Sequence, residues 1–154
     1  MADLELQDLP LRLKEGVQLV ERGALDKGRA VFEGYLEIHP ESALALSYAG
    51  MLRTVKDGLI HEGLDMCREA ARRDPQEALC FLNLARAYLA MGDRYQCVRA
   101  VNKGLKLRSP HREYLNAFYS TIGRRRNPPI GFLSRNNPIN ALLGKLSWRL
   151  EGRK

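Results

Sequence analysis

The sequence contains few cysteines, and no two of them have the spacing of a metal site or a redox motif. Three are present, Cys67, Cys80 and Cys97, and none belongs to a C-x2-C pair. An odd number without that spacing argues against a disulfide framework and against a zinc site. We therefore expect three buried, reduced thiols, no metal and no cofactor.

Long apolar runs are absent as well. Apolar residues make up 45% of the chain and charged residues 28%, which is ordinary for a soluble globular protein. No run reaches the roughly 18 apolar residues that a membrane-spanning helix needs. The first ten residues contain three acidic and no basic side chains, whereas a secretory signal starts with basic residues followed by an apolar stretch. A cytoplasmic protein is the expectation.

The motifs of common enzymes are also missing. There is no glycine-rich phosphate loop and no serine nucleophile elbow. The pair His61-Glu62 lacks the second histidine of a zinc-protease helix. The other histidines, His39 and His111, are distant in sequence, and we expect all three on the surface or in loops. These observations predict a protein that is not an enzyme and has no small-molecule substrate.

The clearest pattern that is present extends from Phe81 to Pro110. It matches the sequence pattern W-x2-L-G-x2-Y, followed by A-x3-F and then P, over about 34 residues. Its proline lies one position later than the pattern requires. The segment therefore resembles one repeat of the tetratricopeptide family, which consists of two antiparallel helices joined by a tight turn. The matching positions are Phe81, Leu84, Ala85, Tyr88, Cys97, Val101 and Pro110, with a turn at Gly92-Asp93.

Two earlier segments contain weaker copies of the same pattern. Prolines at positions 40, 75 and 110 recur every 35 residues, and each is expected to follow a second helix because proline disfavours helix in the residue before it. The segment from Gly50 to Gly63 is one residue longer than its counterparts, which predicts an insertion in the first helix or in the turn. The matching positions are Gly16, Leu19, Gly23, Gly28, Phe32 and Pro40, then Leu46, Ala49, Gly58, Cys67, Ala70 and Pro75.

The resemblance implies an all-α fold. A single hairpin cannot bury its shared apolar face alone, so each repeat needs a neighbour. We expect an α-solenoid of three tetratricopeptide-like hairpins with turns near Gly23, Gly58 and Gly92, followed by a capping helix and a C-terminal amphipathic helix. The predicted domains are 9–123, with repeats at about 9–42, 43–77 and 78–110 and a cap at 111–123, and a basic connector and helix at 124–154.

Positive charge is concentrated in the last third of the chain. Residues 1–107 contain 15 Lys and Arg against 16 Asp and Glu, whereas residues 108–154 contain 10 against 2. Such a segment is either the polar surface of a terminal cap or a patch that faces anions, and both interpretations stay open. As a patch, it predicts weak contact with nucleic acid or an acidic membrane. Its candidate residues are Arg124, Arg125, Arg126, Arg135, Lys145 and Arg149.

The end of the chain predicts an amphipathic helix that must bury its apolar stripe. Asn137 suits the N-cap and Pro138 the first helical position. Three kinds of surface could cover the stripe. Two belong to the same chain, namely its groove and the outer side of the capping helix, and the third is external, namely a partner, a second copy of the protein or a membrane. The stripe consists of Ile139, Leu142, Leu143, Leu146 and Leu150.

The resemblance also implies a binding groove. In this family the first helix of each repeat lines the concave face. Members that capture a C-terminal carboxylate place lysine and asparagine there, and Asn83 alone does not form such a clamp. The predicted groove is mostly apolar and consists of Leu13, Val17, Val20, Leu44, Met51, Leu79, Leu82, Arg86 and Leu89.

Together these patterns predict a non-catalytic protein–protein interaction module, a scaffold that binds an apolar helix or an extended peptide in its groove. The alternative is a protein whose basic tail docks on an anionic surface, either nucleic acid or acidic lipid, while the repeats carry a partner.

Overall fold

The computed structural model describes residues 9–122, and all regular structure in this range is α-helical. None of the helices in this part of the chain is long and apolar enough to cross a membrane. The predicted basic tail and its amphipathic helix, residues 124–154, lie outside the described residues. The helices are α1 (Leu11–Glu21), α2 (Leu25–Ile38), α3 (Ala43–Val55), α4 (Ile60–Arg73), α5 (Ala78–Ala90), α6 (Arg94–Leu105) and α7 (Arg112–Ile122).

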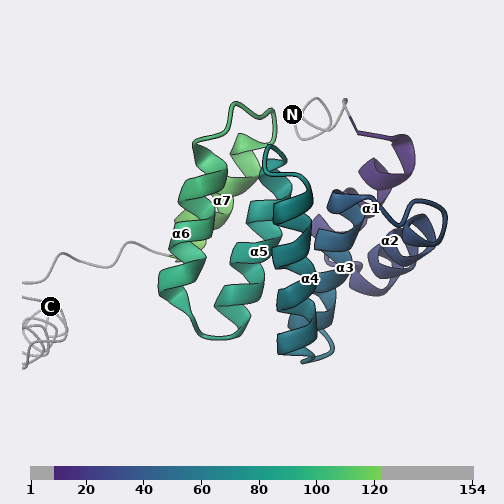
Figure 1. Cartoon of the computed structure of the whole chain (residues 1–154), viewed down its shortest axis with the longest axis horizontal. Helices are drawn as coiled ribbons and strands as arrows, with labels where there is room; N and C mark the ends of the chain where they lie inside the picture. Colours follow the sequence, from purple (N-terminus) through teal and green to yellow (C-terminus); the bar gives the residue numbers. More distant parts are fainter. Residues whose placement is uncertain (1–8, 123–154) are drawn as a thin grey trace, which may run out of the picture. The chain divides into compact units, whose positions relative to one another are not determined.

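The helices pack as three successive hairpins (Figure 1). Within them, α1 packs on α2, α3 on α4, and α5 on α6. Between them, α3 contacts both α2 and α5, and α4 also contacts α5. The seventh helix covers α5 and α6 at the end of the array. The prediction of an α-solenoid with a helix after its third hairpin is therefore confirmed.

Glycine makes each of the three hairpin turns. The φ angles of Gly23, Gly58 and Gly92 are 80°, 70° and 83°, a left-handed conformation that glycine adopts without the strain of a side chain. The predicted turn positions are therefore confirmed. The α3–α4 turn spans residues 56–59, one residue more than the turns at 22–24 and 91–93, so the predicted insertion lies in the turn.

The start of α7 folds back onto the start of α5. One carboxylate oxygen of Glu77 caps α5 by accepting a hydrogen bond of 2.9 Å from the Leu79 amide. The same oxygen lies 3.2 Å from Nδ1 of His111. His111 lies in the turn before α7, in agreement with the expected surface or loop position, but it is buried there, with 3% of its surface exposed. His39 and His61 are exposed, as expected.

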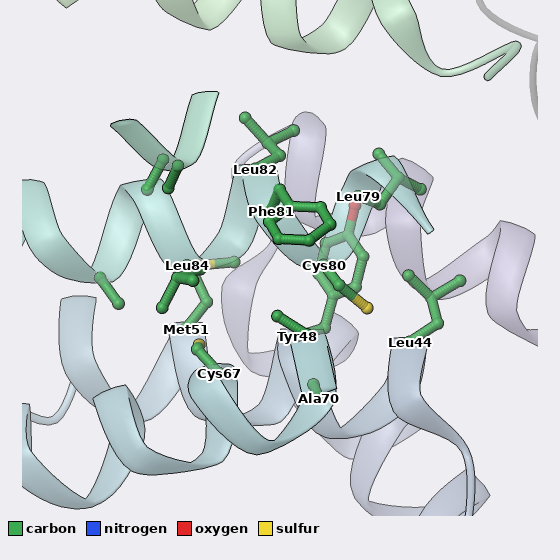
Figure 2. Packing of buried hydrophobic residues seen from close by; sticks show 14 of the residues in the cluster. Leu44, Tyr48, Met51, Cys67, Ala70, Leu79, Cys80, Phe81, Leu82 and Leu84 are labelled. Atoms are coloured by element: carbon green, nitrogen blue, oxygen red, sulfur yellow. The ribbon is translucent and has the colours of Figure 1, made fainter. Parts of the chain in front are cut away.

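The core runs continuously through the hairpins, and α3 and α5 supply half of its buried residues (Figure 2). Phe32 of α2 stacks on Tyr48 of α3, with ring centres 4.5 Å apart and an angle of 8° between the rings. Phe81 is buried at its repeat position, whereas Tyr88 is only partly buried and packs against the core from its edge.

All three cysteines are free and buried, as predicted. Burial disfavours the charged thiolate and raises the pKa of Cys67 to about 12. It also raises the pKa values of Cys80 and Cys97. The three thiols therefore stay protonated at neutral pH and act as small apolar core groups.

Two glycines let the backbones of α3 and α4 touch. A Cβ atom on Gly50 would lie 2.7 Å from the Gly63 carbonyl oxygen, and one on Gly63 would lie 2.4 Å from the Gly50 carbonyl oxygen. A Cβ on Gly63 would also meet the hydroxyl of Thr54 at 2.2 Å. Backbone atoms cannot move aside as a flexible side chain can, so this helix crossing excludes any residue larger than glycine.

We predict opposite effects for two alanine substitutions in helical glycines. Gly63→Ala should lower the free energy of unfolding by about 1 to 3 kcal/mol or more, because it overpacks the α3–α4 crossing. Gly34→Ala, whose Cβ would meet only the end of Arg12 at 3.8 Å, should raise it by up to about 1 kcal/mol through helix propensity. Urea denaturation of both variants tests this, and equal stabilities would contradict the proposed crossing.

Candidate functional site

A pocket of about 390 Å³ lies where the C-terminal ends of α1, α3 and α5 meet α7. We call it the apolar pocket because seven of its nine lining residues are apolar. The remaining two are an acid and a base that pair with each other. The lining residues are Val20, Glu21, Leu25, Met51, Val55, Arg86, Leu89, Ala90 and Phe118.

The packing of the three first helices brings these side chains together. Glu21 and Val55 are the last residues of α1 and α3, and Leu89 is the last but one of α5, so all three lie in the last turn of a first helix. Val55 remains 50% exposed and Leu89 38% exposed. Two large apolar side chains thus face solvent at the rim of the pocket, where an apolar ligand could cover them.

One ion pair crosses the pocket wall. The guanidinium of Arg86 donates hydrogen bonds of 2.8 and 3.2 Å to the two carboxylate oxygens of Glu21. The central carbon of that guanidinium lies 5.8 Å from the centre of the Phe118 ring. The pair joins the first hairpin to the third across 65 positions of sequence. Because the two charges compensate each other, the wall presents no net charge to a ligand.

Four of the nine predicted groove residues line this pocket: Val20, Met51, Arg86 and Leu89. The structure buries the other five between helices, where they form the core and not an open surface. The physical reason is that neighbouring helices cover the face that was expected to be open: α1 packs on α2, α3 packs on α2, α4 and α5, and α5 packs on α3, α4, α6 and α7. The buried residues are Leu13, Val17, Leu44, Leu79 and Leu82.

The sequence prediction missed Leu25, Val55 and Phe118. Val55 could have been found, because it lies in the last turn of its first helix, as Leu89 does. Phe118 could also have been found if the capping helix had been treated as the first helix of a further hairpin, since such a helix lines the same face. Leu25 follows a turn glycine, and no repeat pattern indicates its position.

Asn83 is buried, and its amide nitrogen donates a hydrogen bond of 3.0 Å to the hydroxyl of Ser47. It therefore helps to join α5 to α3 and does not reach a ligand surface. The predicted anion patch, from Arg124 to Arg149, lies outside the described residues. Within the range 9–122, no three or more His, Cys, Asp or Glu residues gather closely enough to hold a metal ion.

In comparisons with known proteins, no family model matches this chain and no curated protein matches its sequence.

We predict that Glu21 and Arg86 are energetically coupled. Glu21→Gln should cost less than about 1 kcal/mol of stability, as expected for a partly exposed ion pair. Arg86→Met should cost more, because it also removes the contact with Phe118. A double-mutant cycle measured by urea denaturation should give a coupling that shrinks as salt is added. Strictly additive effects at low salt would show that the pair does not tie the hairpins together.

Proposed function

We propose that this protein is a non-catalytic interaction module of the tetratricopeptide kind, and that its apolar pocket holds a short apolar segment of a partner protein. The observation that carries the proposal is the pocket itself, with its exposed apolar rim formed by Val55 and Leu89. Apolar pockets with one or two polar groups are the usual form of a binding site.

The dimensions favour a ligand with a few anchoring side chains. The volume of about 390 Å³ is near the lower end of the range for ligand pockets. An amphipathic helix inserts anchors at positions i, i+3 or i+4, and i+7. Each apolar side chain that becomes fully buried contributes about 1.5 to 3 kcal/mol before the cost of association is subtracted. Two or three such anchors support a moderate, reversible affinity.

The neutral ion pair also limits the choice of partner. Glu21 already accepts hydrogen bonds from Arg86. A charged ligand group at this wall would have to displace one member of this ion pair to gain an interaction of similar strength. An uncharged apolar segment leaves the pair intact. This argument favours a partner whose buried face is aliphatic or aromatic over one that presents a carboxylate.

We predict that Leu89→Gln weakens binding of an apolar helical peptide. The probe is a labelled peptide of neutral residues with leucines at i, i+3, i+4 and i+7. Loss of a rim contact worth about 1.4 kcal/mol lowers affinity about tenfold. The matched control is Ile38→Gln, which replaces a 67% exposed apolar residue of α2 outside the pocket. Fluorescence anisotropy should detect the loss in the first variant only.

Two outcomes would contradict this proposal. One is an equal affinity of both variants and the unchanged protein for the peptide. The other is a steep dependence of peptide affinity on salt, because apolar contacts respond weakly to ionic strength whereas charge contacts are screened. Circular dichroism and thermal unfolding of each variant establish that a lost affinity does not reflect lost folding.

A second function is favoured by the charge distribution of the sequence. Residues 108–154 contain 10 Lys and Arg against 2 Asp and Glu, so this segment would be attracted to polyanions. In this alternative, the basic tail docks on nucleic acid or acidic lipid while the repeats carry a partner. The two functions differ in their salt dependence, since release of counterions from phosphates makes only the second strongly salt-sensitive.

For the tail, we predict that changing Arg124, Arg125 and Arg126 together to serine weakens retention on heparin. The slope of log affinity against log salt should become shallower by about 0.7 to 0.9 for each lost phosphate contact. A salt-gradient elution of both proteins measures the difference. If they elute at the same salt concentration, the arginine run is only a solvated surface.

A further inference from the structure

A second cleft, of about 660 Å³, lies on the other helices of the array. Its walls come from α4 and α6, the second helices of adjacent hairpins, and α5 lies between them (Figure 1). We call it the basic cleft, because five of its lining residues are cations and none is acidic. The cations are Arg68, Arg72, Arg99, Lys103 and Lys106.

Helical periodicity arranges these cations in two facing rows. Arg68 and Arg72 are one turn apart on α4, and Arg99 and Lys103 are one turn apart on α6. Lys106 follows directly after α6 and extends the second row. Residues four apart lie on the same side of a helix, so each row points its charges along one wall of the cleft.

The two rows differ in how far their charge is compensated. On α4, Arg68 pairs with Asp65 at 3.1 Å and Arg72 with Glu69 at 2.7 Å, and both acids belong to the same helix. Among the residues described, no carboxylate forms a salt bridge with Arg99, Lys103 or Lys106. The α6 wall therefore has uncompensated positive charge, which an anionic ligand would neutralise.

The aromatic residues at the floor of the cleft argue against single-stranded nucleic acid as its ligand. Such ligands stack their bases on open aromatic faces. The ammonium of Lys103 lies 4.9 Å from the centre of the Phe81 ring, and Phe81 is 2% exposed. The guanidinium carbon of Arg68 lies 5.6 Å from the centre of the Tyr88 ring, and its Nε donates to the Tyr88 hydroxyl at 3.3 Å. Both rings are thus already occupied by cations of the protein.

Between the cation rows, the floor is a narrow apolar strip. Leu84 of α5 lies there, with Ala71 of α4 and Ala100 of α6 beside it. This arrangement is complementary to a peptide that has an aliphatic side chain in the middle and acidic side chains on either flank. Carboxylates would meet the cations at the walls, and the aliphatic group would cover the strip.

We propose that the basic cleft binds an acidic segment of a partner protein, one in which aspartate or glutamate flanks an aliphatic residue. This site is separate from the apolar pocket, with which it shares no lining residue. The ligand chemistry is that of closely spaced carboxylates on a peptide.

The test measures binding of a labelled peptide of about 16 residues composed of glutamate and leucine. The full chain is used, with Arg124, Arg125 and Arg126 changed to serine so that this run does not compete for the probe. In the cleft variant, three cations become glutamine, R99Q, K103Q and K106Q. The control variant loses the same charge elsewhere, through R12Q, R22Q and K27Q, at positions that do not line the cleft.

The cleft variant should bind the acidic peptide at least about tenfold more weakly, a loss of about 1.4 kcal/mol. The control variant should stay within about twofold, because at moderate salt distant charges are screened. Lys106→Gln alone should weaken binding of the acidic peptide to a smaller extent. Because Lys106 is exposed and follows α6, this variant keeps the test valid if the triple variant unfolds. Leu89→Gln should leave binding of this peptide unchanged, which separates this test from that of the apolar pocket.

Equal affinities of the cleft and control variants would overturn the proposal, since only net charge would then matter. A thymidine oligonucleotide of about 16 residues serves as the rival probe. If it binds more tightly than the peptide and shows the same dependence on Arg99, Lys103 and Lys106, the cleft is a nucleic-acid site and the proposal fails. Preference for the peptide supports it.

Discussion

The burial of α3 and α5 on nearly all sides is the constraint on which the rest of the structure depends. Each of these helices buries nine of its 13 residues, whereas α2 buries two of 14 and α7 two of 11. A helix that is apolar around most of its circumference is stable only when other helices enclose it. The second and third hairpins therefore require neighbours on both sides, and α1, α2 and α7 supply them at the ends of the array.

This enclosure determines where ligands could bind. The middle turns of α3 and α5 are almost fully packed, so they offer no open face. Free surface remains at the last turns, where Val55 and Leu89 form the rim of the apolar pocket, and between the second helices, where the rows ending in Arg72 and Lys106 face each other. The two proposed sites have opposite chemistry because helix ends near the core expose aliphatic groups, whereas the outer helices present their solvated, charged side.

Local signals made much of the fold predictable from the sequence. The turn glycines are the clearest example, because the conformation of a turn depends on only a few neighbouring residues. The structure has a left-handed glycine at each predicted turn, namely Gly23, Gly58 and Gly92. The open surfaces were not predictable in this way. The sequence shows that Leu79 and Leu82 belong to an apolar helix, but only the packing of α3, α4, α6 and α7 around α5 decides whether they are covered. The net charge of residues 1–107 is close to zero, so it gave no sign of the cluster of cations that α4 and α6 form.

The two proposed sites involve different parts of the array, and this has a thermodynamic consequence. A ligand that binds only the folded state stabilises the elements that form its site. The apolar pocket includes residues of α1, α3, α5 and α7, so an occupant would bridge all three hairpins and reinforce the link that Glu21 and Arg86 make between the first and the third. The basic cleft involves only α4, α5 and α6. In a stacked array each hairpin is coupled mainly to its neighbours, and neither Glu21 nor Arg86 lines the cleft. A ligand in the cleft would therefore leave local unfolding of α1 nearly unchanged, whereas one in the apolar pocket would suppress it.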